Sequence, residues 1–221
     1  MKIALYIYYF LRSLFLRGLF SSLALLRAEP FYEKKFGIKT AKIKRSSSTE
    51  FFHYQGASYQ QLIRILKDIY PLTKEFNFVD IGCGKGRAVF VAEFSGYNQL
   101  TGIELDDALL LEARENLKIY PLKRVGSQIE FLHVNALDYS YKNAKTLYFL
   151  FNPFNEEVLR KVIQKIKKES FSETWFIYMN PLYPKPFDEA GLVLVKNFKT
   201  HFYTEAQVYR MNPENKIYIN S

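Results

Sequence analysis

From about residue 58 onward, short apolar runs alternate with stretches in which apolar residues recur at helical spacing. The stretch YQQLIRILKDIY is typical of the second kind and predicts a helix that Pro71 ends. The apolar runs predict buried strands. Strands are expected at 76–81, 100–105, 129–134, 146–151, 174–179, 192–198 and 206–211. Helices are expected between them at 86–95, 107–119 and 155–168.

Strands that alternate with helices predict an α/β fold: a doubly wound, mostly parallel seven-stranded sheet with helices on both faces. The last two strands lack a connecting helical stretch long enough for a parallel crossover, so we expect an antiparallel pair at the C-terminal edge. An N-terminal helical extension precedes the sheet. The expected division is a basic amphipathic helix and linker at 1–48, followed by one domain at 49–221.

The formal net charge of +9 is concentrated at the front of the chain. Residues 1–48 hold ten Lys or Arg residues against two acids, whereas the rest is close to neutral. The uncharged runs within 1–27 are nine residues long, shorter than the about 20 that span a bilayer. Two interpretations stay open: a helix lying on an anionic membrane surface, or a helix packed on the domain or on a second copy. Nucleic acid is not expected as a partner, and 33–50 is expected to be a linker or lid.

The single cysteine, Cys83, excludes an internal disulfide and favours a reducing compartment. No cluster of thiols or histidines predicts a metal site. We therefore expect a cytoplasmic protein, peripheral to the inner face of the membrane if the first interpretation of residues 1–48 holds.

Candidate chemistry is concentrated in the stretch VDIGCGKG, where Asp80 ends a predicted strand and glycines follow at alternate positions. A dinucleotide fingerprint would need a third glycine at position 87, which is Arg87, and a phosphate-binding P-loop string is absent. A carboxylate here would repel a pyrophosphate. It would instead favour a phosphate-free cofactor that carries an ammonium and a sulfonium group.

These features resemble the class I S-adenosylmethionine-dependent methyltransferases from about Tyr59 to the end of the chain. The resemblance implies that VDIGCGKG holds the methionyl part of the cofactor, and that TGIELD binds both ribose hydroxyls through its glutamate. In FLHVNALDY it places Asn135 where the family usually has an aspartate that binds the adenine amino group, with Asp138 as a second candidate. The implied cofactor-binding residues are Asp80, Gly82, Cys83, Gly84, Gly86, Glu104, Leu105, Asn135 and Ala136.

The stretch YFLFNPF resembles, one proline short, the Asn-Pro-Pro-aromatic motif of methyltransferases that act on nitrogen. The resemblance implies that Asn152, Pro153 and Phe154 orient the acceptor. Asn-Pro is also an ordinary strand terminator, and Asn180-Pro181 repeats it. His53 is a further candidate, near a lid.

We therefore expect an S-adenosylmethionine-dependent methyltransferase whose acceptor is unidentified, with a nitrogen of a protein or small molecule as one candidate. Two alternatives remain. One is a non-catalytic adaptor that keeps the fold and binds a membrane surface. The other, less favoured, is an NAD(P)-dependent oxidoreductase, against which Asp80 and Arg87 argue.

Overall fold

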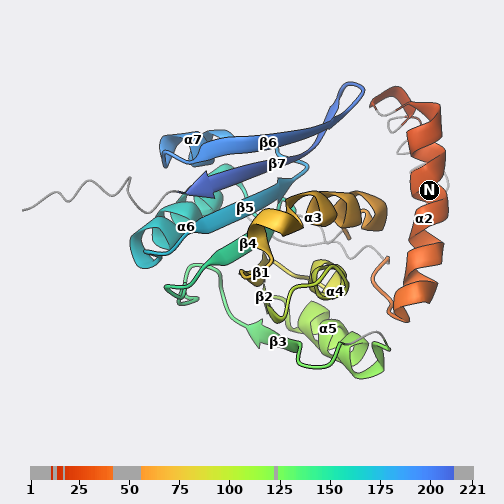
Figure 1. Cartoon of the computed structure of the whole chain (residues 1–221), viewed down its shortest axis with the longest axis horizontal. Coiled ribbons are helices and arrows are strands. Elements are labelled where there is room, and N and C mark those ends of the chain that lie inside the picture. Colours follow the sequence, from red (N-terminus) through yellow and green to blue (C-terminus); the bar gives the residue numbers. More distant parts are fainter. Residues whose placement is uncertain (1–10, 12–13, 17, 42–55, 122–123, 212–221) are drawn as a thin grey trace, which may run out of the picture.

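The structure, a computed structural model, describes residues 11, 14–16, 18–41, 56–121 and 124–211. Its described residues form one seven-stranded sheet in the order β3-β2-β1-β4-β5-β7-β6 (Figure 1). The strands are β1 (Asn77–Ile81), β2 (Gln99–Glu104), β3 (Gln128–His133), β4 (Thr146–Leu150), β5 (Thr174–Met179), β6 (Val193–Thr200) and β7 (Tyr203–Met211). β7 is antiparallel to β5 and β6, and the other pairs are parallel. The expected sheet with an antiparallel edge pair is confirmed.

Helices pack on both faces of the sheet and enclose two hydrophobic clusters (Figure 1). The first cluster lies under α3 (Tyr59–Thr73), α4 (Arg87–Phe94) and α5 (Asp107–Ile119). The second lies under α6 (Glu156–Glu169) and the short α7 (Lys185–Glu189). Every residue of β4 and β5 is buried, because helices cover both faces of these central strands. This explains why the sequence shows continuous apolar runs there instead of alternation.

One expected helix boundary is wrong: Pro71 lies inside α3, which continues to Thr73. A proline inside a helix removes one backbone hydrogen bond to the carbonyl four residues earlier. Here that carbonyl belongs to Lys67, and both Lys67 and Pro71 are exposed, so water can solvate the carbonyl. The helix therefore tolerates the proline in its last turn.

The described residues near the front of the chain differ from the single amphipathic helix followed by a linker that was expected within 1–48. Residues 14–16 are helical, Gly18 has φ 81°, and a new helix, α2 (Leu19–Phe36), begins after it and runs into the segment expected to be a linker. At its end, the Phe36 ring stacks on Tyr59 with centroids 5.4 Å apart. Among the described helices, none combines the length and apolar character needed to cross a bilayer. The division of the chain at residue 48 stays a prediction.

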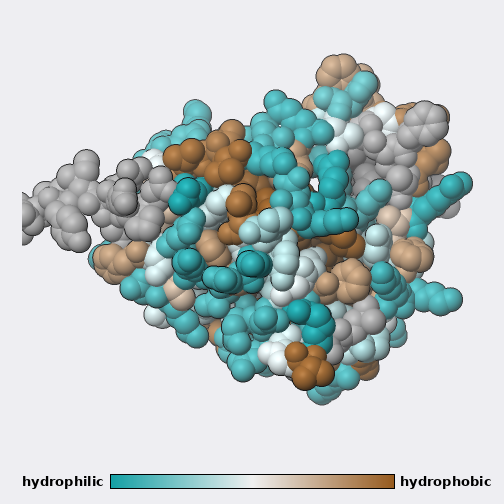
Figure 2. Space-filling model, in the orientation of Figure 1, coloured by the Kyte–Doolittle hydropathy of each residue, from teal (hydrophilic) through white to brown (hydrophobic). Residues whose placement is uncertain are grey.

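The edge strand β6 carries exposed apolar residues at its start, namely Val193, Leu194 and Val195. Figure 2 shows this apolar area over β6 and α7. A register shift between Leu194 and Lys196 interrupts the regular pairing there, as is common at sheet edges. The start of β6 pairs with the end of β7, and the end of β7 pairs in turn with the first residues of β5. This area is therefore at the opposite end of the sheet from the site described next.

Candidate functional site

The candidate residues gather at the carboxyl ends of β1, β2 and β4, where the strand order reverses between β1 and β4. Ligands of open α/β sheets bind at such a reversal. The glycine turn follows β1, Glu104 ends β2, and Asn152 follows β4. The sheet therefore brings together the segments that the sequence motifs singled out.

The turn after β1 depends on its glycines. Gly82, Gly84 and Gly86 have φ values of 77°, 54° and 84°, a region that residues with a Cβ rarely adopt. A Cβ atom on Gly82 would lie 2.6 Å from the Cβ of Pro153, and one on Gly86 would lie 2.6 Å from the Phe131 ring. Glycine at position 82 thus lets the loop after β4 approach the turn.

Two cations beside these glycines, Lys85 in the turn and Arg87 at the start of α4, face away from the site. The Lys85 ammonium lies 2.7 Å from a carboxylate oxygen of Glu112 on α5. The Arg87 guanidinium, only 4% exposed, is 2.7 Å from Glu29 and 3.4 Å from Glu33, both on α2. Helices outside the site therefore neutralise the positive charges that a phosphate-binding turn would direct at its ligand.

Arg87 is a hub for segments that precede β1 in the chain. Its Nε donates to the Thr40 hydroxyl at 2.7 Å, and its Nη1 donates to the Ala57 carbonyl at 2.7 Å. The guanidinium also lies over the Tyr59 ring, 4.2 Å from the centroid. Because Arg87 is the first residue of α4, it fixes α2 and the start of α3 against the helix that follows the glycine turn.

Asp80 is buried at the carboxyl end of β1. Burial raises its pKa well above the usual range, and the Glu104 carboxylate raises it further. Burial likewise raises the pKa of the Cys83 thiol, with Asp80 and Glu104 adding to the effect, so the thiol stays protonated. A bound cation would lower the pKa of Asp80 and relieve the repulsion between the two carboxyl groups.

Glu104 already accepts three backbone hydrogen bonds. One oxygen accepts from Gly84 N at 2.8 Å, and the other accepts from Leu105 N at 2.8 Å and Asp106 N at 2.9 Å. A carboxylate has about four acceptor positions, so one is left. Binding of two ribose hydroxyls, as the resemblance implies, therefore requires Glu104 to exchange at least one of these backbone donors. The neighbouring Leu105 side chain is exposed.

The segment after β3 is held by a local turn. The Asn135 Oδ1 accepts from Leu137 N at 2.9 Å. The carbonyl of the buried Ala136 accepts from the Tyr141 hydroxyl at 2.8 Å. Asp138 joins the turn through its N–H, which donates to the Asn135 carbonyl at 2.9 Å. An amide oxygen has two lone pairs, so Asn135 Oδ1 can accept one further hydrogen bond.

Asn152 follows β4 with φ 45° and is 7% exposed. Its Nδ2 donates to the main-chain carbonyl of Asn180, whereas its Oδ1 is buried and has no partner among the described residues. Pro153 lies against Gly82. Phe154 is buried in the cluster under α6, so its ring lies in the core and not at the open edge.

Two residues of this network were not singled out as functional from the sequence. Asn180, after β5, was noted only as a repeat of the Asn-Pro strand terminator, and its side-chain oxygen accepts from the Tyr203 hydroxyl. Tyr203 starts β7 and carries no local motif. His53 lies outside the described residues.

No model of a known protein family matches the sequence. A curated relative, the tRNA (uracil-O(2)-)-methyltransferase of Schizosaccharomyces pombe, is 39% identical over 61 residues. That match covers 28% of this chain and 11% of the relative, so the chain corresponds to about a tenth of that protein's length.

Three solved structures with a similar fold are methyltransferases with different acceptors in their names. Magnesium protoporphyrin IX methyltransferase from Synechocystis PCC 6803, with bound S-adenosylmethionine, has 12% identity and a TM-score of 0.53 over 69% of this chain and 77% of that one. Ribosomal protein L11 methylase from Lactobacillus delbrueckii subsp. bulgaricus has 13% identity and a TM-score of 0.52 over 70% and 79%. The tRNA (uracil-54, C5)-methyltransferase of Pyrococcus abyssi, with S-adenosyl-L-homocysteine, has 14% identity and a TM-score of 0.50 over 78% and 45%.

The chain therefore has the fold of the class I S-adenosylmethionine-dependent methyltransferases, as its motifs indicated. The expectation that nucleic acid is not a partner is overturned, because two of these proteins are named as tRNA methyltransferases. That expectation considered only the charge of residues 1–48. The charge at the front of the chain does not decide which acceptor reaches the carboxyl edge of the sheet.

Proposed function

We propose that this protein is an S-adenosylmethionine-dependent methyltransferase whose acceptor is an N–H group of an RNA. The observation that carries the proposal is the pair of carboxyl groups at Asp80 and Glu104, from which both cations of the glycine turn are directed away. Such a site repels a pyrophosphate and attracts a positively charged ligand. This argues against the nicotinamide-dependent alternative.

The donor set of the site suits this cofactor. Asp80 supplies a carboxylate for its cationic part, Glu104 one for its ribose, and Asn135 an acceptor for its adenine. When bound, the cofactor supplies a methyl group already activated on a sulfonium. The protein's own contribution is to hold the acceptor in line and to exclude water, which together lower a barrier by roughly 7–11 kcal/mol in well-oriented systems.

Asn152 is the residue that supports a nitrogen acceptor. Its Oδ1 is a buried hydrogen-bond acceptor with no partner in the described part of the chain, and an N–H group of the substrate can satisfy it. The names of the tRNA methyltransferases above support RNA as the acceptor class. Nucleobases present N–H groups of the kind that Asn152 Oδ1 can accept from.

Calorimetry and a transfer assay test the proposal together. We expect the protein to bind S-adenosylmethionine and S-adenosylhomocysteine but not NAD, and to bind the cofactor more weakly after Asp80→Asn. Incubation with methyl-labelled cofactor and a fractionated cell extract should place the label in RNA, in a form that survives removal of protein and lipid. Absence of cofactor binding contradicts the activity. Label in protein, lipid or small molecules contradicts the acceptor class. Cofactor binding without transfer to any fraction favours the non-catalytic alternative.

A further inference from the structure

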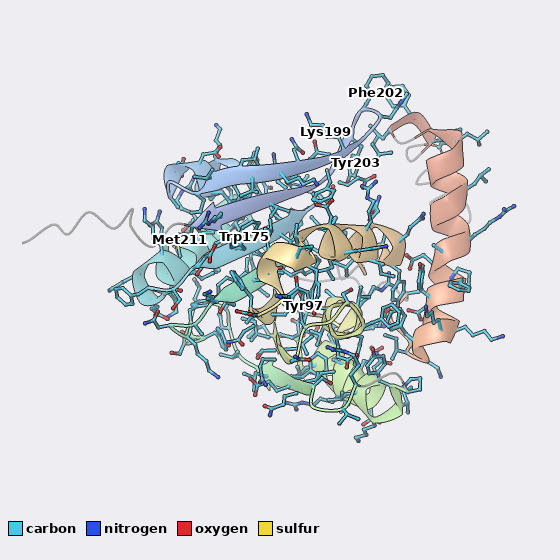
Figure 3. The ribbon with its side chains drawn as sticks, viewed as in Figure 1. Tyr97, Trp175, Lys199, Phe202, Tyr203 and Met211 are labelled. Carbon is cyan, nitrogen blue, oxygen red and sulfur yellow. The ribbon has the colours of Figure 1, made fainter. Side chains whose placement is uncertain are left out.

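The ends of three adjacent strands meet around Asn152. Asn152 follows β4, Asn180 follows β5, and Tyr203 begins β7, which lies beside β5 in the sheet. Figure 3 shows Tyr203 near the tip of the β6–β7 hairpin, next to Phe202 and Lys199. Hydrogen bonds run from the Tyr203 hydroxyl to Asn180 Oδ1, and from Asn152 Nδ2 to the Asn180 main-chain carbonyl.

The contact with Asn180 fixes which way the Asn152 amide faces. A carbonyl oxygen can only accept a hydrogen bond, so it must face the NH₂ side of the amide. Rotating the amide by half a turn would place two oxygens against each other. The Asn152 Oδ1 therefore points away from Asn180, and it is the atom that is buried without a partner among the described residues.

Asn180 is itself held at both ends. Its φ of 49° lies in the left-handed region, which asparagine tolerates better than most residues. Its N–H donates to the Glu205 carbonyl at 2.8 Å, and its side chain is bound by the Tyr203 hydroxyl. These two contacts set the direction of the carbonyl that Asn152 binds.

We propose that Tyr203 and Asn180 are positioning residues, which hold the Asn152 amide so that Oδ1 is presented to the N–H of the methyl acceptor. The proposal rests on the proposed function and extends it to residues of β5 and β7. It also sets a specificity rule: aspartate cannot replace Asn152, because an ionised carboxylate has no hydrogen for the Asn180 carbonyl.

A double-mutant cycle tests whether Tyr203 acts through Asn152. Tyr203→Phe removes one hydroxyl, and we expect kcat to fall roughly tenfold, the value of one hydrogen bond, with the cofactor Kd unchanged. Asn152→Ala and Asn152→Asp should each lower kcat by about 100-fold, the scale of a misplaced reacting group. In the Asn152→Ala background, Tyr203→Phe should cause no further loss. An equal loss in both backgrounds, or no loss in either, would overturn the positioning role.

The same strand offers a matched control. The Tyr209 hydroxyl of β7 donates to Gln207 at 2.9 Å, in the core under α6 and α7, so Tyr209→Phe makes the same chemical change without touching Asn152. It should leave kcat within about twofold of the wild type. Asn180→Asp retains an oxygen for Tyr203 and should keep most of the activity, whereas Asn180→Ala should not.

A readout without turnover separates this proposal from the proposed function. With asparagine side-chain nitrogens labelled, the Asn152 NH₂ signal is identified by its loss in Asn152→Ala. We expect slow solvent exchange of this group in the wild type, faster exchange in Tyr203→Phe, and wild-type exchange in Tyr209→Phe. Unchanged exchange in Tyr203→Phe refutes the positioning role. The expected exchange pattern in a protein that transfers no methyl group refutes the proposed function alone.

Discussion

Replacing Arg87 by methionine tests how strongly the N-terminal helix is built into the domain. Methionine has an unbranched side chain that replaces the aliphatic stem of arginine but carries no charge. The change removes the donors to Thr40 and Ala57 and the countercharge to Glu29 and Glu33. Both carboxylates would then lie close together without a cation.

The expected loss in the free energy of unfolding follows from the burial of the ion pairs that Arg87 makes. Removing one partner of a buried ion pair typically costs about 3–5 kcal/mol, because the remaining charge is left uncompensated. Glu29 and Glu33 are 32% and 19% exposed, so water screens part of their charge and we take the lower end, about 3 kcal/mol. For a chain of this size that corresponds to a loss of roughly 6–12 °C in Tm.

The loss of stability in Arg87→Met should grow as the pH rises. Burial raises the pKa of Glu29 and Arg87 lowers it, so removing Arg87 raises that pKa further. A carboxyl group whose pKa is raised by folding destabilises the protein as the pH rises above the unfolded value. The difference between Arg87→Met and wild type should therefore be largest at pH 7 and shrink as the pH falls toward 4.5, the ordinary glutamate value.

Urea unfolding followed by circular dichroism measures both quantities. Arg160→Met is the matched control, because Arg160 also contacts two glutamates, Glu156 and Glu189, but on the exposed surface of α6. Its unfolding midpoint should equal that of the wild type. Adding Glu29→Gln and Glu33→Gln to Arg87→Met should restore part of the stability. A loss below about 1 kcal/mol at pH 7, or one that does not shrink in acid, would refute the reasoning.

Three further variants probe the cofactor side. Gly82→Ala places a Cβ 2.6 Å from Pro153 at a φ of 77°, and should abolish cofactor binding measured by calorimetry while far-UV circular dichroism still reports a folded protein. Asp80→Asn should weaken cofactor binding at least tenfold. It should also raise the free energy of unfolding more at pH 8 than at pH 5, because the raised pKa means that the ionised group is destabilising. Glu104→Gln turns one acceptor oxygen into an NH₂ group near Gly84 N, and should raise the cofactor Kd by about tenfold or more; an unchanged Kd would contradict its assigned role.

The sheet and the glycine turn after β1 could be predicted from the sequence because their signals are local. Strands covered on both faces appear as continuous apolar runs, and β1 and β4 fall within one residue of their expected bounds. The glycine turn is equally readable, since positive φ values and the close approach of Pro153 both require glycine. The orientation of Lys85 and Arg87 was not readable, because their charge suggests an anion site until their partners are known.

The N-terminal segment shows why the remainder escaped prediction. Glu29 and Glu33 lie 58 and 54 residues before Arg87, and no spacing rule links them. Read alone, the segment is a basic, apolar stretch. In the structure, its two acidic residues are the ones that contact the domain at Arg87. A count of net charge could not identify that contact, because the two glutamates that make it are outnumbered by the basic residues of the same segment.

The residues proposed to hold the acceptor are likewise joined by contacts between positions far apart in the sequence. Neighbours of this fold are named for a porphyrin, a ribosomal protein and a tRNA, so the shared sheet does not by itself select an acceptor. In this chain, the hydrogen-bonded set of Asn152, Asn180 and Tyr203 comes from the ends of β4, β5 and β7, with successive members 28 and 23 positions apart in the sequence. Only the antiparallel insertion of β7 beside β5 brings Tyr203 to Asn180. The order of the edge strands therefore brings together the residues that we propose to hold the acceptor, and a motif confined to one loop cannot encode that arrangement.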